Sequence, residues 1–554
     1  MNKLYNHWIN HKNVNDKYKE IMRNMSQDEI DVFFNEKLIQ MGTAGYRAKI
    51  GPGNHNLNEF TYAQLTIGYA KYLITKYKNF PNQLSILIVH DNRKNGDLYT
   101  RICANILKQY GIKVILNNNN ELLPTPIASY LIPKLGCVGC INITASHNPK
   151  EYNGFKCYDH TGCQLLPDDS NMIIQNMPDS YEILDIDIDS TDTGFEYIKE
   201  KHIDDYFADV KKRLLRSNVS ENNRIKLVYS AMHGTASNYM SKFLNSMGYE
   251  CYDVLEQNYP DSNFTNTPIC NPEDPKSLLK AIELADSKNI NIVFASDPDA
   301  DRLAIGIKKN GEWVFLNGNQ AGIIETHYRL MMLNDDTREK IVISTYISNN
   351  LIDRMVLNQG YVIRTATGFK WVGDQINNLD FNKQVYVNGF EEAIGALPTD
   401  LNRDKDSFQT ALLMLEILNY YYDKGYDYID ILENEIYPKY GHWYGNTTSL
   451  VIDGLDWKEK AEKMLNKLMV FNKQYVLERQ VINVIYNDAG SCLEIYFKND
   501  SWVKFRLSGT EPKFKIYLNL YLDNDSNDVD YNISKQLQAE AENIVQYFKE
   551  FLFQ

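Results

Sequence analysis

The chain has 554 residues, which is enough for three to four domains of ordinary size. Apolar residues make up 44% of it and charged residues 23%, a composition typical of globular proteins and not of disordered or fibrous ones. The 72 acidic residues outnumber the 58 Lys and Arg residues, so the net charge is −14. Because such a surface repels phosphate backbones and anionic lipids, we expect neither nucleic acid nor a membrane as a partner.

Two further features bear on where the chain acts. It has no run of 18 apolar residues and no apolar block at its start, so we expect neither a spanning helix nor a signal peptide. Its eight cysteines are scattered, which fits free thiols in a reducing cytosol, and we expect a cytoplasmic protein. Cys137 and Cys140 form a C-x-x-C pair, but a zinc site requires a second such pair. We expect buried strand cysteines here, with a metal or redox pair as the alternative.

Short apolar strands alternate with helices in the first part of the chain. Residues 26–29 (SQDE) have the pattern of a capping box that opens a helix, and a glycine-rich turn follows at residues 42–47. Beyond this turn we expect strands at 84–89, 114–116 and 140–143, and helices at 97–110 and 126–135. This alternation is typical of a mostly parallel sheet covered on both faces.

The same alternation recurs twice along the chain. The second unit has predicted strands at 225–229, 251–254 and 290–295, and predicted helices at 239–246 and 276–287. The third has predicted strands at 341–345, 361–364 and 385–387. Beyond residue 440 the strands follow one another, at 481–486 and 492–498, before a last helix that runs to Phe553. The fold class we expect is α/β, with three α/β units followed by one α+β unit.

The first segment with chemistry is residues 144–150 (TASHNPK), directly after a predicted strand, where open α/β sheets bind ligands. A serine exposed on such a turn, here Ser146, can act as a nucleophile or a phosphoryl carrier. Lys156 follows in a returning segment and can donate or accept a proton if its pKa is lowered. The alternative is an ordinary polar Asn-Pro turn.

The second segment is residues 297–302 (DPDADR), again after a predicted strand. In an extended loop the period of two places Asp297, Asp299 and Asp301 on one side, and three hard oxygen ligands suit Mg²⁺. An EF-hand also begins with this spacing, but Arg302 and Lys308 stand where it needs Gly and Glu, so that interpretation fails. A solvated acidic turn is the remaining alternative.

The third and fourth segments point to a phosphorylated polyol. Residues 389–395 (GFEEAIG) carry paired carboxylates that can accept hydrogen bonds from vicinal hydroxyls, although an ordinary helix start would also begin this way. Residues 506–512 (RLSGTEP) combine an arginine, two hydroxyls and a glycine into a candidate phosphate cradle, with a plain turn as the alternative. The chain lacks the motifs of P-loop, dinucleotide-binding and α/β-hydrolase proteins. Together the four segments indicate phosphoryl transfer on a phosphosugar without ATP.

In this order the four segments resemble the α-D-phosphohexomutase superfamily, and the resemblance covers nearly the whole chain. It implies three related mixed-sheet α/β domains and a TBP-like α+β domain around a central cleft. The expected boundaries are 1–215 (phosphoserine domain), 216–312 (metal-binding domain), 313–435 (sugar-binding domain) and 436–554 (phosphate-binding domain). The match is sharpest to the eukaryotic type-two phosphoglucomutase and phosphopentomutase branch, on residues 42–47, 51–53, 367–373, 390–395 and 404–406.

The resemblance also implies a mechanism and a set of site residues. Ser146 would carry a phosphoryl group, and Mg²⁺ would be held by that phosphate together with Asp297, Asp299 and Asp301. Transfer to the sugar monophosphate would form a bisphosphate, such as glucose 1,6-bisphosphate, which turns around and returns its other phosphate. The implied catalytic residues are Ser146, Lys156, His147 and Arg47. The implied substrate-binding residues are Arg302, Thr367, Gly368, Glu391, Lys405, Arg506, Ser508, Gly509 and Thr510.

Three departures from the family pattern bear on the sugar. Ala393 replaces a serine common in glucose-type members, Phe369 stands where phosphomannomutases tend to have His, and residues 396–403 diverge. We expect a mutase that converts glucose 1-phosphate to the 6-phosphate, or ribose and deoxyribose 1-phosphates to the 5-phosphates. Phosphomannomutase, a glucose 1,6-bisphosphate synthase and a non-catalytic phosphosugar-binding protein are the alternatives. Apart from small phosphosugars we expect no partner, and a monomer or weak dimer.

Overall fold

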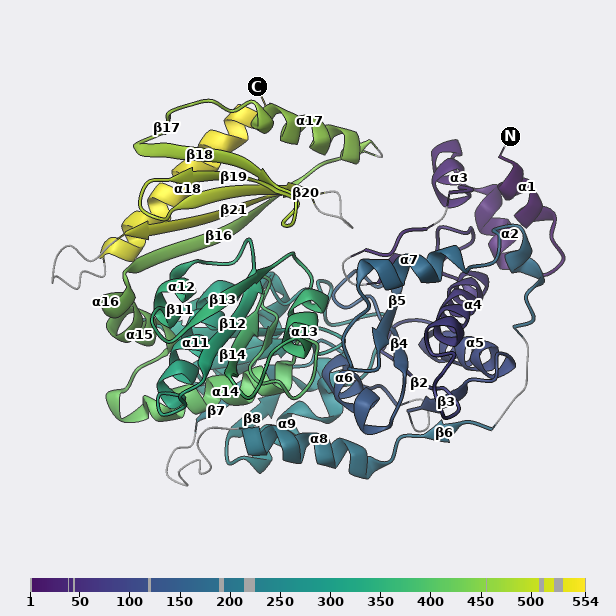
Figure 1. Cartoon of the computed structure of the whole chain (residues 1–554), viewed down its shortest axis with the longest axis horizontal. Coiled ribbons are helices and arrows are strands. Elements are labelled where there is room, and N and C mark those ends of the chain that lie inside the picture. Colours follow the sequence, from purple (N-terminus) through teal and green to yellow (C-terminus); the bar gives the residue numbers. More distant parts are fainter. Residues whose placement is uncertain are drawn as a thin grey trace. The chain divides into compact units, whose positions relative to one another are not determined.

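The chain divides into two compact units in the computed structural model (Figure 1). The model describes residues 2–37, 39–42, 45–117, 121–188, 194–213, 225–454, 456–507, 513–522 and 532–553. The first unit comprises Met1–Ile305 and Asp400–Gln409, and the second comprises Gly306–Thr399 and Thr410–Gln554. The short segment 400–409 thus leaves its sequence neighbours and folds with the first unit.

Three helices open the first unit: α1 (Lys3–Asn10), α2 (Asp16–Arg23) and α3 (Gln27–Phe33). The predicted capping box at the start of α3 is confirmed, because Ser26 and Glu29 satisfy each other's backbone N–H groups. The three helices bury Trp8 and neighbouring apolar side chains in a cluster of their own.

The first sheet has the strand order β1-β5-β4-β2-β3-β6. The three strands predicted from the sequence are present as β2 (Ser85–His90), β3 (Lys113–Leu116) and β4 (Gly139–Ile143), all parallel to one another. The sheet is nevertheless mixed, because β1 (Tyr46–Lys49) and β5 (Tyr152–Asp159) run antiparallel to their neighbours, whereas β6 (Glu196–Tyr197) is parallel to β3. The antiparallel return of β5 brings Lys156 back beside β4.

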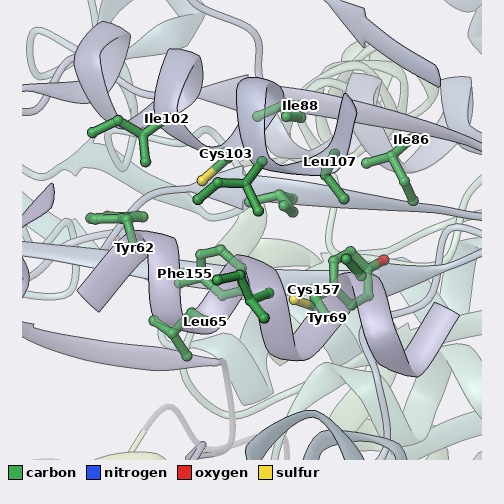
Figure 2. Close-up of a cluster of buried hydrophobic side chains, with 14 of the residues drawn as sticks. Tyr62, Leu65, Tyr69, Ile86, Ile88, Ile102, Cys103, Leu107, Phe155 and Cys157 are labelled. Atoms are coloured by element: carbon green, nitrogen blue, oxygen red, sulfur yellow. The ribbon is translucent and has the colours of Figure 1, made fainter. Parts of the chain in front are cut away.

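Helices α4 (Glu59–Lys76) and α5 (Gly96–Gln109) pack against the first sheet and against each other. Figure 2 shows the buried cluster that these helices form with strand residues. The cluster combines aromatic and branched aliphatic side chains and contains no charged group. Its labelled members are Tyr62, Leu65, Tyr69, Ile86, Ile88, Ile102, Cys103, Leu107, Phe155 and Cys157. Since α4 is apolar nearly all round, it is buried over most of its length. Helix α7 (Pro167–Gln175) packs against α4, and helix α6 (Thr125–Lys134) contacts β2 and β4.

The second sheet contains the parallel strands β7 (Lys226–Ser230), β8 (Glu250–Asp253) and β9 (Ile292–Ser296), followed by β10 (Leu303–Lys309), in the order β10-β9-β7-β8. Its helices are α8 (Glu200–Arg213), α9 (Met240–Ser246) and α10 (Leu279–Lys288). The three strands predicted for this part are confirmed. The predicted helix at 276–287 begins instead as a short 3₁₀ turn, Pro275–Leu278, before α10.

The second unit begins within β10, which forms a hairpin with β11 (Glu312–Phe315). Its first sheet has the order β13-β12-β14-β15, with β12 (Glu339–Thr345), β13 (Gly360–Thr365) and β14 (Gln384–Phe390) parallel and β15 (Ala396–Leu397) antiparallel. The three predicted strands of this region are confirmed. The accompanying helices are α11 (Gly318–Met332), α12 (Leu351–Val356), α13 (Phe369–Asn377), α14 (Ser407–Tyr420), α15 (Tyr428–Ile431) and α16 (Tyr437–Tyr440).

The last sheet is antiparallel, in the order β16-β21-β20-β19-β18-β17. Its strands are β16 (His442–Val451), β17 (Tyr475–Val476), β18 (Arg479–Asn487), β19 (Cys492–Phe497), β20 (Trp502–Leu507) and β21 (Lys513–Leu522). Helices α17 (Trp457–Met469) and α18 (Asn532–Phe553) share a core with the sheet. This β-rich C-terminal domain and the α/β sheets before it confirm the expected fold class.

Two negative expectations from the sequence concern cysteines and membranes. All eight cysteines are free thiols, and Cys137 and Cys140 are buried, Cys140 within β4, as the sequence predicts. Among the described helices, none combines the length and the apolar character that a membrane span requires.

Candidate active site

Ser146 lies on the turn that follows β4, and its side chain is only 1% exposed. Its backbone is left-handed, with φ of 51°, a conformation that L-residues other than Asn and Asp rarely adopt. The turn is held locally by the Ser146 N–H, which donates to Thr144 Oγ1 at 2.9 Å. The Ser146 Oγ donates to Asp297 Oδ2 at 2.6 Å, so the two segments predicted from separate strands meet in the fold.

The three aspartates predicted as metal ligands form one buried group. Asp297, Asp299 and Asp301 each offer a carboxylate oxygen within 4.8 Å of the others, and each is at most 2% exposed. The Asp297 Oδ1 accepts the backbone N–H groups of Asp301 and Arg302, at 3.1 and 3.0 Å, which curls the loop around that carboxylate. Asp299 Oδ1 and Asp301 Oδ1 are buried without a hydrogen-bond partner among the described residues. Unsatisfied buried carboxylate oxygens are costly, and hard divalent cations are their natural partners, so these residues fit Mg²⁺.

Two buried lysines face this acidic group. Lys156 Nζ lies 2.7 Å from Asp299 Oδ2 and 3.6 Å from Asp301 Oδ2. Lys405 Nζ lies 3.0 Å from Asp301 Oδ2 and 3.0 Å from Asp404 Oδ1. The lysines therefore offset part of the negative charge through the Oδ2 atoms of Asp299 and Asp301, and they do not occupy the Oδ1 atoms.

The burial of these charges shifts their pKa values in opposite directions. Burial, with the like charges of Asp299 and Asp301, raises the pKa of Asp297 well above its usual range. For Asp299 burial acts in the same upward direction, but the Lys156 ammonium and a hydrogen bond from Asp297 outweigh it and hold the pKa low. Burial and charge neighbours thus favour the ionised form of Asp299 and the protonated form of Asp297.

His147 and Arg47 flank the serine. His147 Nδ1 lies 3.3 Å from Ser146 Oγ, and burial together with Arg302 and Arg47 lowers the pKa of His147 well below its usual value, so the imidazole is neutral. Arg47, on β1, donates from Nη1 to Asn148 Oδ1 at 2.9 Å, one residue beyond His147. Arg302 lies 3.6 Å from Glu273 and 3.8 Å from Asp301. His147 thus contacts the serine directly, Arg47 contacts the residue after His147, and Arg302 lies beside the acidic loop.

The predicted sugar-reading residues lie together in the second unit. Glu391 Oε1 accepts the backbone N–H of Gly368 at 2.8 Å, and Gly368 has φ of 111°, a value that glycine adopts readily. This contact joins the loop after β14 to the start of α13, beside Thr367. The loop at 391–395 is not a helix start, which was the alternative for this segment. Burial and the neighbouring Glu391 raise the pKa of Glu392 to about 7.

The predicted phosphate cradle is described only in part. Arg506 lies on β20, paired with Lys515 of β21, and contributes to the field at Glu392. Ser508, Gly509 and Thr510 lie outside the described residues. For these three positions the cradle stays a prediction.

The expected residues therefore separate into two groups. The first unit brings together the serine, the acidic loop and the cations around them: Ser146, His147, Arg47, Lys156, Asp297, Asp299, Asp301, Arg302 and Lys405. The second unit holds Thr367, Gly368, Glu391 and Arg506. Two members of this group, Arg302 and Lys405, were predicted among the substrate-binding residues, and of these Lys405 is distant in sequence from the rest of the group. Its segment is drawn into the first unit by Asp404, which accepts hydrogen bonds from Tyr158 and Gln164, at 2.8 and 2.7 Å.

Sequence reasoning missed two sets of residues that shape the site. Thr125 donates its N–H to Asp299 O at 2.9 Å and its hydroxyl to Asp299 Oδ2 at 3.1 Å. Asp91 and Arg93 follow β2 and pack under the Ser146 turn. A signal was available for the second set, since residues 91–93 (DNR) follow a predicted parallel strand as Ser146 does.

Comparisons with known protein families agree with this arrangement. Three family profiles match, described as phosphoglucomutase/phosphomannomutase alpha/beta/alpha domains I, II and III, at residues 38–183, 204–311 and 317–436. The phosphomannomutase of Mycoplasmoides pirum is 40% identical over 525 residues, covering 94% of this chain and 96% of that protein. A phosphoglucomutase of Staphylococcus aureus is 30% identical over 509 residues, covering 88% of this chain and 90% of the relative.

Solved structures share the fold at lower sequence identity. Parafusin (phosphoglucomutase) from Paramecium, in its open form, superposes with a TM-score of 0.67 at 19% identity, covering 92% of this chain and 97% of that one. A phosphoglucomutase/phosphomannomutase family protein from Burkholderia thailandensis gives a TM-score of 0.66 at 18% identity, covering 93% and 98%. At such identities the likeness supports the architecture alone.

Proposed function

The chain belongs to the phosphoglucomutase/phosphomannomutase family, and from this premise we propose that it is a phosphohexomutase that works through a phosphoserine at Ser146. It would interconvert a sugar 1-phosphate and the 6-phosphate by way of a bisphosphorylated sugar. The observation that carries the proposal is the contact of Ser146 Oγ with Asp297 Oδ2 at 2.6 Å, beside two buried carboxylate oxygens that lack partners.

The proposed reaction moves a phosphoryl group from Ser146 to a sugar hydroxyl. The Oγ–P bond of phosphorylated Ser146 breaks while a bond forms between phosphorus and a sugar hydroxyl oxygen, and the hydroxyl proton is passed on to Ser146 Oγ. We propose Lys156 Nζ as the acid/base group on this path, with neutral His147 beside Oγ. Arg47 and Arg302 would orient the charged phosphate. In a second transfer, Ser146 Oγ takes the other phosphoryl group of the bisphosphate: its bond to the sugar oxygen breaks, that oxygen receives the Ser146 hydroxyl proton, and the phosphoserine is regenerated.

Mg²⁺ is the proposed cofactor, held by Asp297, Asp299 and Asp301. It would supply charge neutralisation at the phosphoryl group, which is the main electrostatic demand of such a transfer. Asp299 Oδ1 and Asp301 Oδ1 support this assignment, because both are buried and neither has a hydrogen-bond partner among the described residues. Glucose 1,6-bisphosphate is the proposed intermediate and activator, because a bisphosphate that escapes must be replaced to rephosphorylate Ser146.

We propose that Thr367, Gly368 and Glu391 recognise the sugar hydroxyls. Arg506, with Ser508, Gly509 and Thr510, would hold the phosphate that is not reacting. The four-domain division at residues 215, 312 and 435 and the eukaryotic-type branch also stay predictions, as does a monomeric or weakly dimeric state.

The proposal also concerns which sugar 1-phosphate the enzyme prefers. Glucose and mannose 1-phosphates are both candidate substrates, since relatives carry the names phosphoglucomutase and phosphomannomutase. Pentose 1-phosphates are a second candidate class, favoured by Ala393, which leaves one hydroxyl contact absent from the sugar loop. A panel of glucose, mannose, ribose and deoxyribose 1-phosphates, compared by kcat/KM, ranks these substrates directly.

Replacement of the serine tests the reaction itself. Ser146→Ala should lower kcat by about a thousandfold or more, because the phosphoryl carrier is gone. Intact mass should show one phosphate on the wild-type chain after treatment with glucose 1,6-bisphosphate and Mg²⁺, and none on the variant. Ser170→Ala, at a buried serine of α7 outside the site, is the control and should keep wild-type activity. Normal turnover by Ser146→Ala would refute the mechanism.

A further inference from the structure

A single arginine organises the turn that carries Ser146. The Arg93 side chain is fully buried, and all five of its N–H donors are used. Four of them donate to backbone carbonyl oxygens of one short loop, residues 146–152. The acceptors are Ser146 O at 2.6 Å, Asn148 O at 2.7 Å, Pro149 O at 2.9 Å and Tyr152 O at 2.9 Å.

The fifth donor binds Asp91, the residue directly after β2. Arg93 Nε donates to Asp91 Oδ2 at 3.1 Å, and the same oxygen accepts the Thr144 hydroxyl at 2.6 Å. Thr144 Oγ1 in turn accepts the Ser146 N–H. A continuous chain of hydrogen bonds therefore reaches Ser146 from both sides, through its own N–H and through its own carbonyl oxygen.

A thiol from the second sheet's connecting segment holds the same loop. Cys270 is buried, and its Sγ lies 3.2 Å from both His147 O and Asn148 O, so the thiol can donate to either carbonyl. Phe264 of that segment lies against the Arg93 guanidinium, 5.5 Å from the ring centre. Arg93 and Cys270 thus both donate hydrogen bonds to carbonyl oxygens of the loop. Neither side chain contacts the Ser146 hydroxyl.

We propose that Arg93 and Cys270 are positioning residues that hold loop 146–152 in the shape from which Ser146 exchanges its phosphoryl group; this inference rests on the proposed function. The left-handed backbone of Ser146 is unfavourable in an unrestrained chain, and it aims Oγ at Asp297. Four carbonyl oxygens converging on one planar guanidinium fix that curvature. A lysine offers three donors from one point and cannot reproduce the fork.

The first test is Arg93→Lys, which keeps the charge opposite Asp91 and removes the fork. We expect kcat to fall by about a hundredfold while KM for the sugar phosphate changes less than about twofold, because a misplacement of the nucleophile by about 1 Å acts on the transfer step. Phosphorylation of Ser146 by glucose 1,6-bisphosphate, followed by quenched intact mass, should slow by a similar factor. The shift of the melting temperature by Mg²⁺ should persist, since the three aspartates are unchanged.

Arg479→Lys is the matched control. Arg479 is a largely buried arginine of the last sheet that donates to Glu540 and Ser501, far along the chain from Ser146. It should lose stability without losing kcat. If Arg93→Lys likewise only melts earlier and phosphorylates Ser146 at the wild-type rate, Arg93 has a merely structural role and the inference is wrong.

Cys270→Ala covers the case in which Arg93→Lys does not fold. It should lower the rate of Ser146 phosphorylation about three- to tenfold, with Cys270→Ser restoring part of the loss because a hydroxyl also donates to carbonyls. An unchanged rate in Cys270→Ala would overturn the inference. Failure of the proposed function gives another result: wild-type protein would then take up no phosphate on Ser146, whatever the variants do.

Discussion

The two compact units of the chain differ in the charged partners of their buried carboxylates. In the first unit the buried carboxylates Asp299 and Asp301 each have an ammonium group within about 3 Å, from Lys156 and Lys405. In the second unit Glu325 and Glu392 are carboxylates without a salt bridge among the described residues, and their pKa values are raised to about 8 and 7. In the first unit the charged groups contact one another, and in the second unit Thr367, Gly368 and Arg506 are half-buried.

This difference fits a division of labour. Phosphoryl transfer requires groups held in place before the transition state forms, because any reorganisation of charges at that moment adds to the barrier. Recognition of a sugar in two orientations requires contacts that can accept either end. Substitutions in the two units should therefore differ in their effects on phosphoryl transfer, metal binding and sugar preference.

The largest effect is expected at Lys156. Lys156→Met removes the proposed acid/base group and leaves Asp299 without its nearest cation, so kcat should fall by about 10²- to 10⁴-fold. Steady-state kinetics measures the loss. Lys76→Met, at a surface ion pair with Asp169, is the control and should leave kcat nearly unchanged. A Lys156→Met enzyme within twofold of wild type would remove Lys156 from the mechanism.

The second largest effect is expected from metal removal, which should depend on carboxylates of the first unit and not on those of the second. Chelation with EDTA should abolish turnover and restoration of Mg²⁺ should recover it, while a saturating concentration of Mg²⁺ should raise the melting temperature. At a concentration of about 100 times Kd the gain in unfolding free energy is about 2.7 kcal/mol. Asp299→Asn should lose most of this gain, and Asp427→Asn, at an acidic pair of the second unit, should keep it. An equal shift in both variants would contradict the assignment of the metal to the three aspartates.

The unpaired carboxylate of the second unit should make stability depend on pH. Burial raises the pKa of Glu325 from 4.5 to about 8, so the folded chain keeps a proton that the unfolded chain loses between these values. Its contribution to stability therefore falls as pH rises from about 4.5 to 8. Glu325→Gln should raise the free energy of unfolding by about 2–4 kcal/mol at pH 8.5 and change it little near pH 4.5.

Calorimetry at the two pH values checks this prediction. The geometry favours the amide, because Glu325 Oε2 accepts from Asn388 Nδ2 at 2.9 Å while Glu325 Oε1 and Asn388 Oδ1 are both buried without partners. A benefit of the same size at both pH values would show that packing, and not ionisation, is responsible.

The smallest effect is expected in the sugar loop. Ala393→Ser restores a hydroxyl beside Glu391 and should raise kcat/KM for glucose 1-phosphate relative to ribose 1-phosphate by about three- to tenfold, the value of one added hydrogen bond. Competition between the two substrates measures the ratio. Phosphorylation of Ser146 should be unaffected, because this loop belongs to the other group. An unchanged ratio would show that residue 393 does not read the sugar.

Much of the transfer site could be predicted because its signals are local. Ser146 and Asp297 each follow a short apolar strand, the position at which open α/β sheets bind ligands. The strand order itself places them in neighbouring sheets, which no local pattern specifies. Arg93 shows where this reasoning stops: it also follows a strand, but its acceptor Ser146 O is 53 residues later in the chain. Lys405 was predicted among the substrate-binding residues, and the structure places its ammonium group 3.0 Å from Asp301 Oδ2.

The sequence by itself determined the alternation of strands and helices, the chemistry available at each strand end, and the period of two that gathers three carboxylates. Those features depend on backbone geometry over a few residues. Only the tertiary structure decided that Lys156 and Lys405 lie beside the aspartates, that Arg93 donates to the carbonyl oxygens of the serine turn, and that Glu325 is buried without a salt bridge among the described residues. Each of these depends on burial and on contacts between distant segments, where removal from water turns weak preferences in charge and hydrogen bonding into large free-energy differences.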